Sequence, residues 1–211
     1  MIEVILCDDH ALIRRGIRNT LAEAVDMRVV GEAGEYGELR SLMRTTRCDV
    51  LVLDISMPGR SGLDVLQVLK DEGNSVKVLV VSMYPEDQYA IRALRGGAYG
   101  YVNKAGDPQI IVQAVRTVAQ GRKYVTPEIA QMLVESLTSP SPEQAHDSLS
   151  DRELQTLTMI ASGKRLSDIA TELSLSPKTV SVYRARVLQK LGLANNAELT
   201  VYAIRNALTG K

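Results

Sequence analysis

At 211 residues the chain is long enough for two modest domains, and its 45% apolar and 24% charged residues are ordinary for a soluble globular protein. No stretch approaches about 18 unbroken apolar residues and the opening MIEVILCDDH has no basic segment ahead of its apolar run, so we expect neither a membrane span nor a signal peptide. The formal net charge is zero, but residues 148–211 carry nine Lys or Arg against five Asp or Glu while residues 1–147 carry sixteen against twenty, which favours an acidic module joined to one that meets a polyanion.

Strand-like and helix-like segments alternate from the N-terminus to Ala119. Apolar, β-branched runs predict strands over residues 2–7, 28–33, 50–53, 76–81 and 99–102. Helical spacing of apolar residues predicts helices over residues 11–24, through 39–43 and 63–69, and over 86–94 and 108–119. Five such repeats predict an α/β fold, a doubly wound five-stranded parallel sheet covered by helices on both faces.

The rest of the chain is all helical in pattern. An amphipathic helix is predicted over residues 127–137, and TSPSPEQAHD, residues 138–147, is the clearest linker because Ser, Pro and polar residues dominate it. Helices follow over residues 151–161, 167–173, 177–191 and 196–208, with Ser150 or Asp151 able to cap the first and Ser176 followed by Pro177 at the start of the third. We therefore expect a domain over 1–121, a helix and linker over 122–147, and an all-α domain over 148–211.

The two cysteines, Cys7 and Cys48, lie in or beside predicted buried strands. Two thiols without close spacing form neither a metal site nor a disulfide framework, so we expect both in the core and the protein in a reducing cytoplasm.

Polar side chains stand at or just after the ends of four predicted strands: Asp8 and Asp9, Asp54, Ser82 and Lys104. The carboxyl ends of parallel strands meet at one crevice, so these groups are expected to converge. Three acids so close repel one another unless a cation neutralises them, and hard carboxylate oxygens suit Mg²⁺, which leaves room for a phosphoryl ligand. Taken alone, Asp54 could merely cap the next turn. The convergence favours phosphoryl transfer to Asp54, with Lys104 and Ser82 contacting the oxyanion.

The segment LVLDISMPGRSG and these polar groups, in their order and spacing, make residues 1–121 resemble a bacterial receiver domain. The resemblance implies that Asp54 accepts a phosphoryl group from a partner histidine kinase. It also implies Mg²⁺ binding by Asp9, Asp54 and the backbone carbonyl of Ser56, with Asp8 acting through water.

The resemblance extends to a switch pair and has one departure. Ser82 and Tyr101 match the family's pair, in which the hydroxyl moves toward the phosphoryl group and the aromatic ring turns inward. Many receivers have Pro directly after the lysine, in a cis bond, whereas Ala105 follows Lys104 here and leaves the path of that loop open.

Three further residues, His10, Met57 and Met83, stand beside these motifs. His10 follows the acid pair, but no second His is nearby, so we favour neither a metal-ligand nor a phosphohistidine role for it. Met57 and Met83 are interpreted as packing residues of the active-site loops.

The segment SDIATELSLSPKTVSVYRARVLQKLG contains a short helix, a tight turn and a longer helix that is apolar on one side and basic on the other. Such a helix fits the major groove of DNA, although a solvated face on an ordinary bundle has the same composition. The residue order makes residues 148–208 closely resemble the four-helix helix-turn-helix of the LuxR type, which implies that residues 177–191 are the recognition helix.

By that resemblance the positions that face base edges are Ser181, Val182 and Ala185. The positions for phosphates or the groove wall are Lys178, Thr179, Tyr183, Arg184, Arg186 and Lys190. Some relatives have lysines where this chain has Ser181 and Ala185, so their target sequence is not transferred.

A receiver joined to this helix-turn-helix resembles a two-component response regulator of the NarL/FixJ family. The resemblance implies a cytoplasmic transcription regulator whose only chemistry is its own Mg²⁺-dependent phosphoryl transfer and dephosphorylation. Phosphorylation of Asp54 by a sensor histidine kinase is expected to free a recognition helix or dimer surface, so that a homodimer binds double-stranded promoter DNA.

Two rivals remain for comparison. A haloacid-dehalogenase-type phosphatase also uses an Asp after a buried strand with Mg²⁺, but such enzymes resemble D-x-D there, and position 56 is Ser. A small-molecule sensor joined to the same helix-turn-helix would need an apolar pocket, which a crevice lined by acids, Ser and Lys does not offer.

Overall fold

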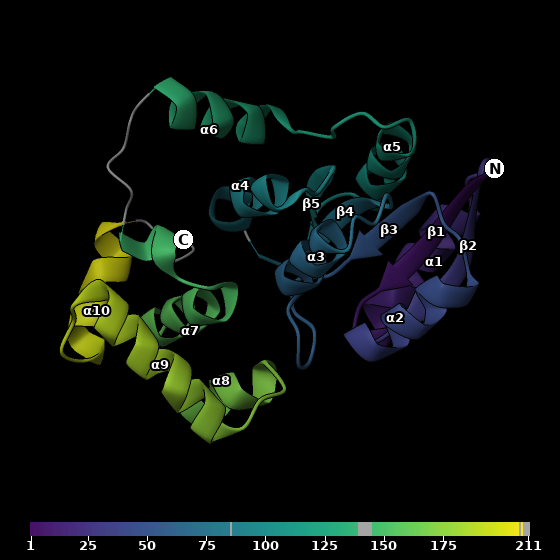
Figure 1. The fold of residues 1–211 in the computed structure, drawn as a ribbon. Coiled ribbons are helices and arrows are strands. Elements are labelled where there is room, and N and C mark those ends of the chain that lie inside the picture. The colour runs from purple at the N-terminus through teal and green to yellow at the C-terminus, as the bar shows by residue number, and fades with distance from the viewer. Residues whose placement is uncertain (85, 139–144, 207, 209–211) are drawn as a thin grey trace. The chain divides into compact units, whose positions relative to one another are not determined.

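A parallel sheet in the order β2-β1-β3-β4-β5 forms the centre of the first of two units, Met1–Leu137 and Thr138–Lys211 (Figure 1). Its strands are β1 (Ile2–Cys7), β2 (Met27–Ala33), β3 (Val50–Leu53), β4 (Lys77–Ser82) and β5 (Gly100–Asn103). The computed structural model describes residues 1–84, 86–138, 145–206 and 208. The five predicted strands are confirmed, each boundary within one residue.

β1 and β3 lie side by side in the middle of the sheet, so the chain leaves β1 for β2 on one side and returns to β3 on the other. All four residues of β3 are buried, as a strand covered on both faces requires. In sheets of this type ligands bind at the carboxyl ends of the strands where the order reverses, and here that point lies between Cys7 and Leu53, which pair across β1 and β3.

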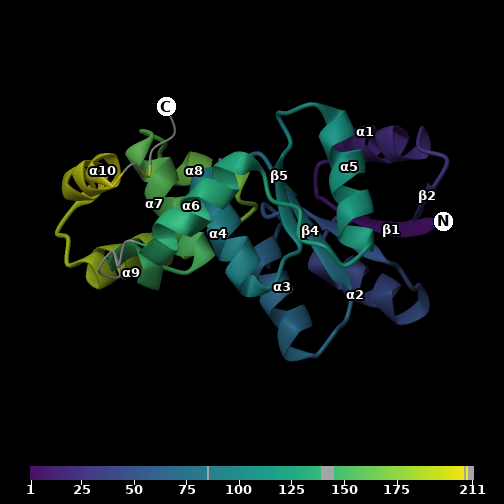
Figure 2. The same cartoon turned by 90° about the horizontal axis from the view of Figure 1, so that it is seen from above.

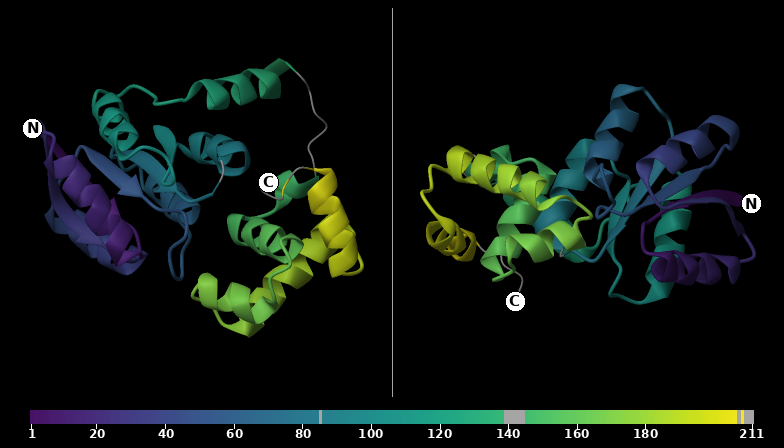
Figure 3. Two further views of the ribbon diagram at one scale, coloured as in Figure 1. Left: turned by 180° about the vertical axis from the view of Figure 1, so that it is seen from behind. Right: turned by 90° about the horizontal axis from the view of Figure 1, so that it is seen from below.

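Helices cover both faces of the sheet. They are α1 (Ala11–Ala22), α2 (Tyr36–Thr45), α3 (Gly62–Asp71), α4 (Glu86–Gly96) and α5 (Pro108–Ala119). α1 packs against α5 on one face, while α2 and α3 lie on the other with α4 against α3, as the views from above and below show (Figures 2 and 3). The predicted doubly wound α/β fold is therefore confirmed.

α6 (Pro127–Thr138) closes the first unit and confirms the helix predicted over residues 127–137. Most of the predicted linker, residues 139–144, lies outside the described residues. Its last residues are not extended, because Ala145–Ser148 form a 3₁₀ helix, η1. The three domain boundaries expected from the sequence stay a prediction.

The second unit consists of η1 and four α-helices: α7 (Asp151–Ala161), α8 (Leu166–Glu172), α9 (Pro177–Leu191) and α10 (Asn196–Arg205). α7 packs against α9 and α10, and α8 packs against α9. Ser150 is the N-cap of α7 and forms a capping box with Glu153. Ser176 caps α9 ahead of Pro177, and Gly192 ends that helix in the left-handed conformation, with φ 65°.

Two sequence predictions about the fold are corrected. α10 ends at Arg205 rather than at 208, because the side-chain amide of Asn206 donates to the Tyr202 carbonyl, at 2.8 Å, and competes with helix continuation. Cys7 is buried as expected, but Cys48 is only partly buried.

Candidate functional site

The central strands place Asp8 and Asp54 next to each other at the switch point. The Asp54 N–H donates to the Cys7 carbonyl at 2.8 Å, which continues the β1–β3 pairing by one residue. The Asp8 N–H donates to the Ala33 carbonyl of β2, at 3.0 Å. The backbones of both residues are thus held by hydrogen bonds of the sheet, and only 2% of the Asp54 side chain is exposed.

Lys104, just after β5, bridges these two acids. Its Nζ lies 2.7 Å from Asp8 Oδ2 and 2.9 Å from Asp54 Oδ2, and its own N–H donates to the Ser82 carbonyl at 2.8 Å. Burial raises the pKa of Asp54 and the negative charge of Asp8 adds to the effect, while the Lys104 ammonium opposes it. The Lys104 ammonium therefore offsets the effect of burial only in part.

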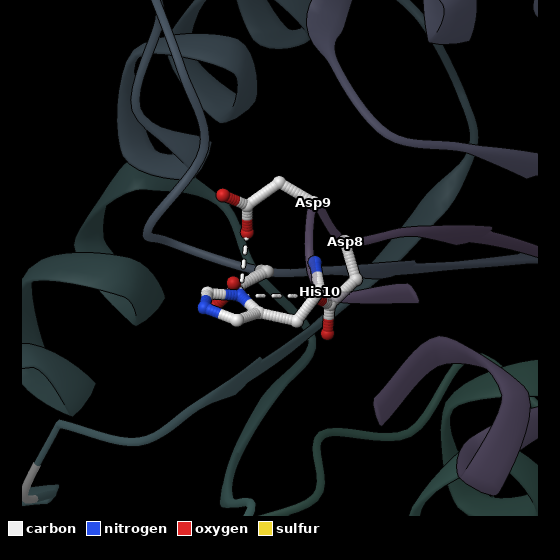
Figure 4. A group of neighbouring side chains, drawn as sticks. Asp8, Asp9 and His10 are labelled. Carbon is white, nitrogen blue, oxygen red and sulfur yellow. Dashed lines mark hydrogen bonds and ion pairs between the residues drawn. The ribbon is translucent and has the colours of Figure 1, made fainter. Parts of the chain in front are cut away.

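Asp9 and His10 complete the acidic edge (Figure 4). Asp8 Oδ1 accepts a hydrogen bond from the His10 backbone N–H at 2.8 Å, and Asp9 Oδ1 lies 2.7 Å from His10 Nδ1. Asp8, Asp9, His10 and Asp54 each offer one ligand atom, and these atoms lie within 4.8 Å of one another.

The residues present fit a divalent cation. Asp54 Oδ1 is buried and has no hydrogen-bond donor among the residues that the structure describes, so a cation would satisfy it. Carboxylate oxygens are hard ligands of the kind that Mg²⁺ prefers. The pocket formed by Asp8, Asp9 and Asp54 is therefore consistent with a metal site.

The loop after β3 turns sharply back toward Asp54. Gly62 opens α3, and a Cβ built there would stand 2.0 Å from the Asp54 carbonyl oxygen, so only glycine permits this approach. Ser61 caps α3 through a capping box with Asp64. Ser56 lies in this loop, half-buried, three residues after the end of β3; the metal contact of its carbonyl stays a prediction.

Ser82 and Tyr101 meet at the loop that follows β4. The Tyr84 N–H donates to Ser82 Oγ at 3.2 Å, and the buried Tyr101 hydroxyl donates to the Tyr84 carbonyl at 2.8 Å. Burial raises the pKa of Tyr101, and a hydrogen bond with Ser82 offsets this only in part. Ser82 lies close to the acidic pocket, because its carbonyl accepts the backbone N–H of Lys104, which pairs with Asp8 and Asp54.

Sequence patterns missed other parts of the site. Arg14 of α1 donates to the Asp8 carbonyl and also pairs with Glu32 at 3.1 Å, so it supports the acid from behind. Arg14 is one of several charged residues on an amphipathic helix, so the sequence alone does not predict its contact with Asp8. Met57 is buried and meets the Cys7 thiol at 3.2 Å, but Met83 is 60% exposed, so its predicted packing role is wrong.

No peptide bond among the described residues is cis, so the Lys104–Ala105 bond is trans. The loop is closed instead by the Ala105 N–H, which donates to Asn103 Oδ1 at 2.8 Å.

α9 presents a polar and basic face to solvent. Its exposed residues among the predicted DNA contacts are Lys178, Ser181, Val182, Ala185, Arg186 and Lys190. The remaining three, Thr179, Tyr183 and Arg184, are half-buried.

Several of these side chains have hydrogen-bond partners inside the unit, and Thr179 Oγ1 lies 2.8 Å from Ser176 Oγ. Lys190 Nζ lies 2.7 Å from Glu153 Oε2 and donates to the Ser148 carbonyl at 3.0 Å, which ties α9 to α7. Arg184 Nε donates to Asn196 Oδ1 at 2.5 Å, and the Ser181 hydroxyl donates to the carbonyl one turn earlier in the helix.

A parallel sheet with acids and a lysine at its strand ends, followed along the chain by a helical unit with an exposed basic helix, defines a regulator with a receiver and a DNA-binding domain. The family described as response regulator receiver domain matches residues 4–116, and the bacterial regulatory proteins of the luxR family match residues 147–203. The chain belongs to the two-component response regulators of the NarL/FixJ family with a LuxR-type DNA-binding domain. It is a transcription regulator rather than a conventional enzyme.

Relatives align over nearly the whole chain. Response regulator UvrY of Escherichia coli (strain K12) is 39% identical over 209 residues, covering 99% of this chain and 96% of the relative. Response regulator GacA of Pseudomonas aeruginosa is 39% identical over 211 residues, covering 99% and 98%.

Solved structures of RcsB from Salmonella are also similar. One, at 27% identity, covers 99% of this chain and 98% of RcsB with a TM-score of 0.68. Another, RcsB bound to the promoter rprA in the presence of the phosphomimetic BeF₃⁻, has a TM-score of 0.63 at 27% identity and covers 95% and 97%.

Proposed function

We propose that Asp54 is the phosphoacceptor of this response regulator and that a sensor histidine kinase supplies the phosphoryl group. The observation that carries the proposal is the pairing of Asp54 Oδ2 with Lys104 at 2.9 Å while Asp54 Oδ1 has no donor among the described residues. Asp54 Oδ2 is held, and Oδ1 is left open to the pocket in which the phosphoryl group and Mg²⁺ would both be bound.

The residues around Asp54 have different roles in phosphoryl transfer. Lys104 neutralises charge on the phosphoryl oxygens, and its burial makes this interaction stronger than it would be in water. Asp9 and Asp54, with the Ser56 carbonyl, would hold Mg²⁺, which when bound neutralises further phosphoryl charge. Asp8 has both oxygens occupied, by Lys104 and by the His10 N–H, so it acts on the ion through water.

Ser82 and Tyr101 carry the signal away from the pocket. The phosphoryl group adds about −1.5 to −2 charge and draws the Ser82 hydroxyl toward it. The Ser82 Oγ now accepts the Tyr84 N–H, so its movement disturbs the loop that Tyr101 also holds. A few kcal/mol of differential stabilisation is enough to shift such an equilibrium.

The output is binding of a homodimer to double-stranded promoter DNA. Its recognition surface is α9, with Ser181, Val182 and Ala185 facing base edges. Phosphates and the groove wall meet Lys178, Thr179, Tyr183, Arg184, Arg186 and Lys190. On α10, Val201 and Ile204 are 48% and 61% exposed one turn apart, which suits a surface that a second copy covers. RcsB is described as dimers on DNA, which supports the same assembly here.

A histidine-kinase partner and two free cysteines support our proposal that the protein works in the cytoplasm. Burial raises the pKa of Cys7 to about 12 and that of Cys48 to about 11, so both thiols stay protonated and unreactive.

Labelling by a small acyl-phosphate donor tests the acceptor directly. Wild-type protein with Mg²⁺ should gain one hydroxylamine-labile phosphoryl group, and Asp54→Asn should gain none. Asp71→Asn, which changes an exposed carboxylate at the end of α3, is the matched control and should label normally. Undiminished labelling of Asp54→Asn would refute the assignment.

A further inference from the structure

Asn103 is the last residue of β5 and lies between two residues that the proposed function uses, Tyr101 and Lys104. It is half-buried and pairs with Ser82 across β4 and β5. Successive side chains of a strand point to opposite faces, so Asn103 and Tyr101 extend from the same face of β5. The proposed function assigns no role to the Asn103 amide.

The side-chain amide of Asn103 makes two hydrogen bonds. Its Oδ1 accepts the Ala105 N–H at 2.8 Å, which is an Asx turn, and its Nδ2 donates to the Tyr84 carbonyl at a longer 3.4 Å. An N–H needs an acceptor and a carbonyl needs a donor, so these two partners fix which way the amide is turned. The shorter bond is expected to be the stronger one.

The Asx turn helps to hold the backbone on both sides of Lys104. On one side, the Lys104 N–H donates to the Ser82 carbonyl at 2.8 Å. On the other side, Asn103 Oδ1 holds the Ala105 N–H, and the Asn103 carbonyl accepts the Gly106 N–H at 3.2 Å. A lysine side chain is a flexible four-carbon stem, so the position of its ammonium depends on a fixed backbone.

The longer bond joins this turn to the loop after β4. The Tyr84 carbonyl that accepts from Asn103 also accepts the Tyr101 hydroxyl, at 2.8 Å. The Tyr84 N–H in turn donates to Ser82 Oγ at 3.2 Å. Asn103 is therefore bonded both to the turn that carries Lys104 and to the loop that is bonded to Ser82.

We propose that Asn103 is a positioning residue for phosphoryl transfer, because its Oδ1 fixes the backbone from which the Lys104 ammonium reaches Asp54, at 2.9 Å. This inference rests on the proposed function, in which Lys104 neutralises charge on the phosphoryl oxygens. Residue 105 must supply an N–H for the bond, which alanine has and proline lacks. Asn103 acts through Lys104 and not on the phosphoryl group itself, so its effect on the rate should vanish when Lys104 is removed.

Labelling of the full chain by an acyl phosphate with Mg²⁺ measures the effect. Asn103→Leu replaces the amide by an apolar group of similar size and should slow labelling by about tenfold, since Lys104 is no longer held in place. Asn103→Ser keeps an oxygen that can accept the same N–H, although more weakly, and should label within about threefold of the wild-type rate. A wild-type rate for Asn103→Leu, or a rate for Asn103→Ser as low as that of Asn103→Leu, would overturn the proposal.

A second Asx turn provides a matched control. Asn74 Oδ1 accepts the Val76 N–H at 2.9 Å just before β4, at the opposite end of the sheet from the acidic pocket. Asn74→Leu breaks the same kind of bond and should leave the labelling rate unchanged. An equal loss of rate in Asn74→Leu and Asn103→Leu would mean that labelling reports a general loosening of the fold, and the proposal would fail.

The Lys104→Met variant separates positioning of the lysine from any other effect. Because Asn103 acts through Lys104, adding Asn103→Leu to Lys104→Met should slow labelling by less than about twofold. A further loss of about tenfold in that background would show that the two residues act independently and would overturn the proposal.

A measurement on the wild type does not depend on any variant. The exposed Ala105 amide should exchange its hydrogen with solvent at least about tenfold more slowly than an unbonded amide, because Asn103 Oδ1 accepts that hydrogen. Labelling of wild-type Asp54 is followed alongside. If the wild type labels and the Ala105 amide is unprotected, this inference alone fails; if the wild type gains no phosphoryl group, the proposed function fails.

Discussion

The charged side chains at the centre of the receiver unit are buried, whereas those on α9 of the DNA-binding unit are exposed to solvent. Lys104 and Asp54 are 4% and 2% exposed and pair at 2.9 Å, while Lys178 and Arg186 stand on the open face of their helix. Phosphoryl transfer gains from a fixed ammonium in a dry site, because its interaction with the developing charge is not screened. DNA binding gains from accessible cations that displace counterions from phosphates. With the roles proposed above, the same residue type is buried where it would meet a phosphoryl group and exposed where it would meet DNA.

The largest expected effect comes from removing the buried cation. Lys104→Met should slow phosphorylation of Asp54 by about a hundredfold to a thousandfold, since the phosphoryl oxygens lose their fixed charge partner. The rate of labelling by an acyl-phosphate donor measures this. Lys178→Met removes an exposed cation of α9 and should leave the labelling rate unchanged. Equal labelling rates for the two variants would contradict the role given to the buried lysine.

A second change breaks the geometry that places Asp54. Gly62→Ala puts a Cβ about 2.0 Å from the Asp54 carbonyl, so the loop must move and the first unit should lose about 2 kcal/mol of unfolding free energy. Denaturant unfolding followed by amide signals of the sheet reports the loss. Gly16→Ala is the matched control, because no atom lies within 4 Å of a Cβ there and alanine favours the interior of α1. If Gly62→Ala is as stable as Gly16→Ala, the close approach of α3 to Asp54 is wrong.

The next prediction concerns the exposed cations of α9 and their contacts with DNA phosphates. Arg186→Ala should weaken promoter binding by about fivefold at 0.15 M salt and lower the salt slope by about 0.9, since one phosphate contact is lost. Binding measured across a salt series gives both values. Arg47→Ala, an exposed arginine of the receiver unit, should change neither. An unchanged salt slope for Arg186→Ala would exclude it from the phosphate contacts.

Lys190 is the exception on α9, since its ammonium pairs with a buried carboxylate. Burial pushes the pKa of Glu153 up, but the hydrogen bond and charge of Lys190, with the hydrogen bonds of Ser150, hold it below its ordinary value of 4.5. The ionised form therefore stabilises the fold above that value, and the stabilisation is lost as pH falls through the lowered folded pKa.

Glu153→Gln should accordingly reduce stability by about 0.5–1 kcal/mol at pH 7, with the difference from wild type vanishing in acid. Denaturant unfolding at several pH values, followed by amide signals of α7, checks this. A double-mutant cycle with Lys190→Met isolates the pair; a pH-independent difference would mean that the Glu153 charge does not contribute.

Patterns of single residues predicted the strands well, and they placed Asp54 at the strand ends where the structure has it. Val50–Leu53 is an unbroken apolar run, which is typical of a strand buried on both faces, and Asp54 follows it at the carboxyl end of the sheet. Ser82 and Lys104 were found by the same argument. These positions follow from short-range periodicity and the topology of parallel sheets.

Other features depend on contacts between distant segments. Arg14 donates to the Asp8 carbonyl, and Lys190 pairs with Glu153. In the sequence, these residues look like any other charged residues on solvent-exposed helix faces. His10 was set aside for want of a second histidine, yet its ring faces the acids. A Cβ at Gly62 would meet the Asp54 carbonyl oxygen, whereas a Cβ at Gly16 would meet no atom within 4 Å. The sequence alone does not distinguish these two glycines.

Phosphodonor-stimulated DNA binding tests the central claim most directly. The affinity of the wild type for its promoter DNA should rise on incubation with an acyl phosphate and Mg²⁺, because the phosphoryl group on Asp54 shifts the population toward the DNA-binding dimer. Asp54→Asn should show the basal affinity with or without the donor. The same rise in wild type and Asp54→Asn would contradict the account.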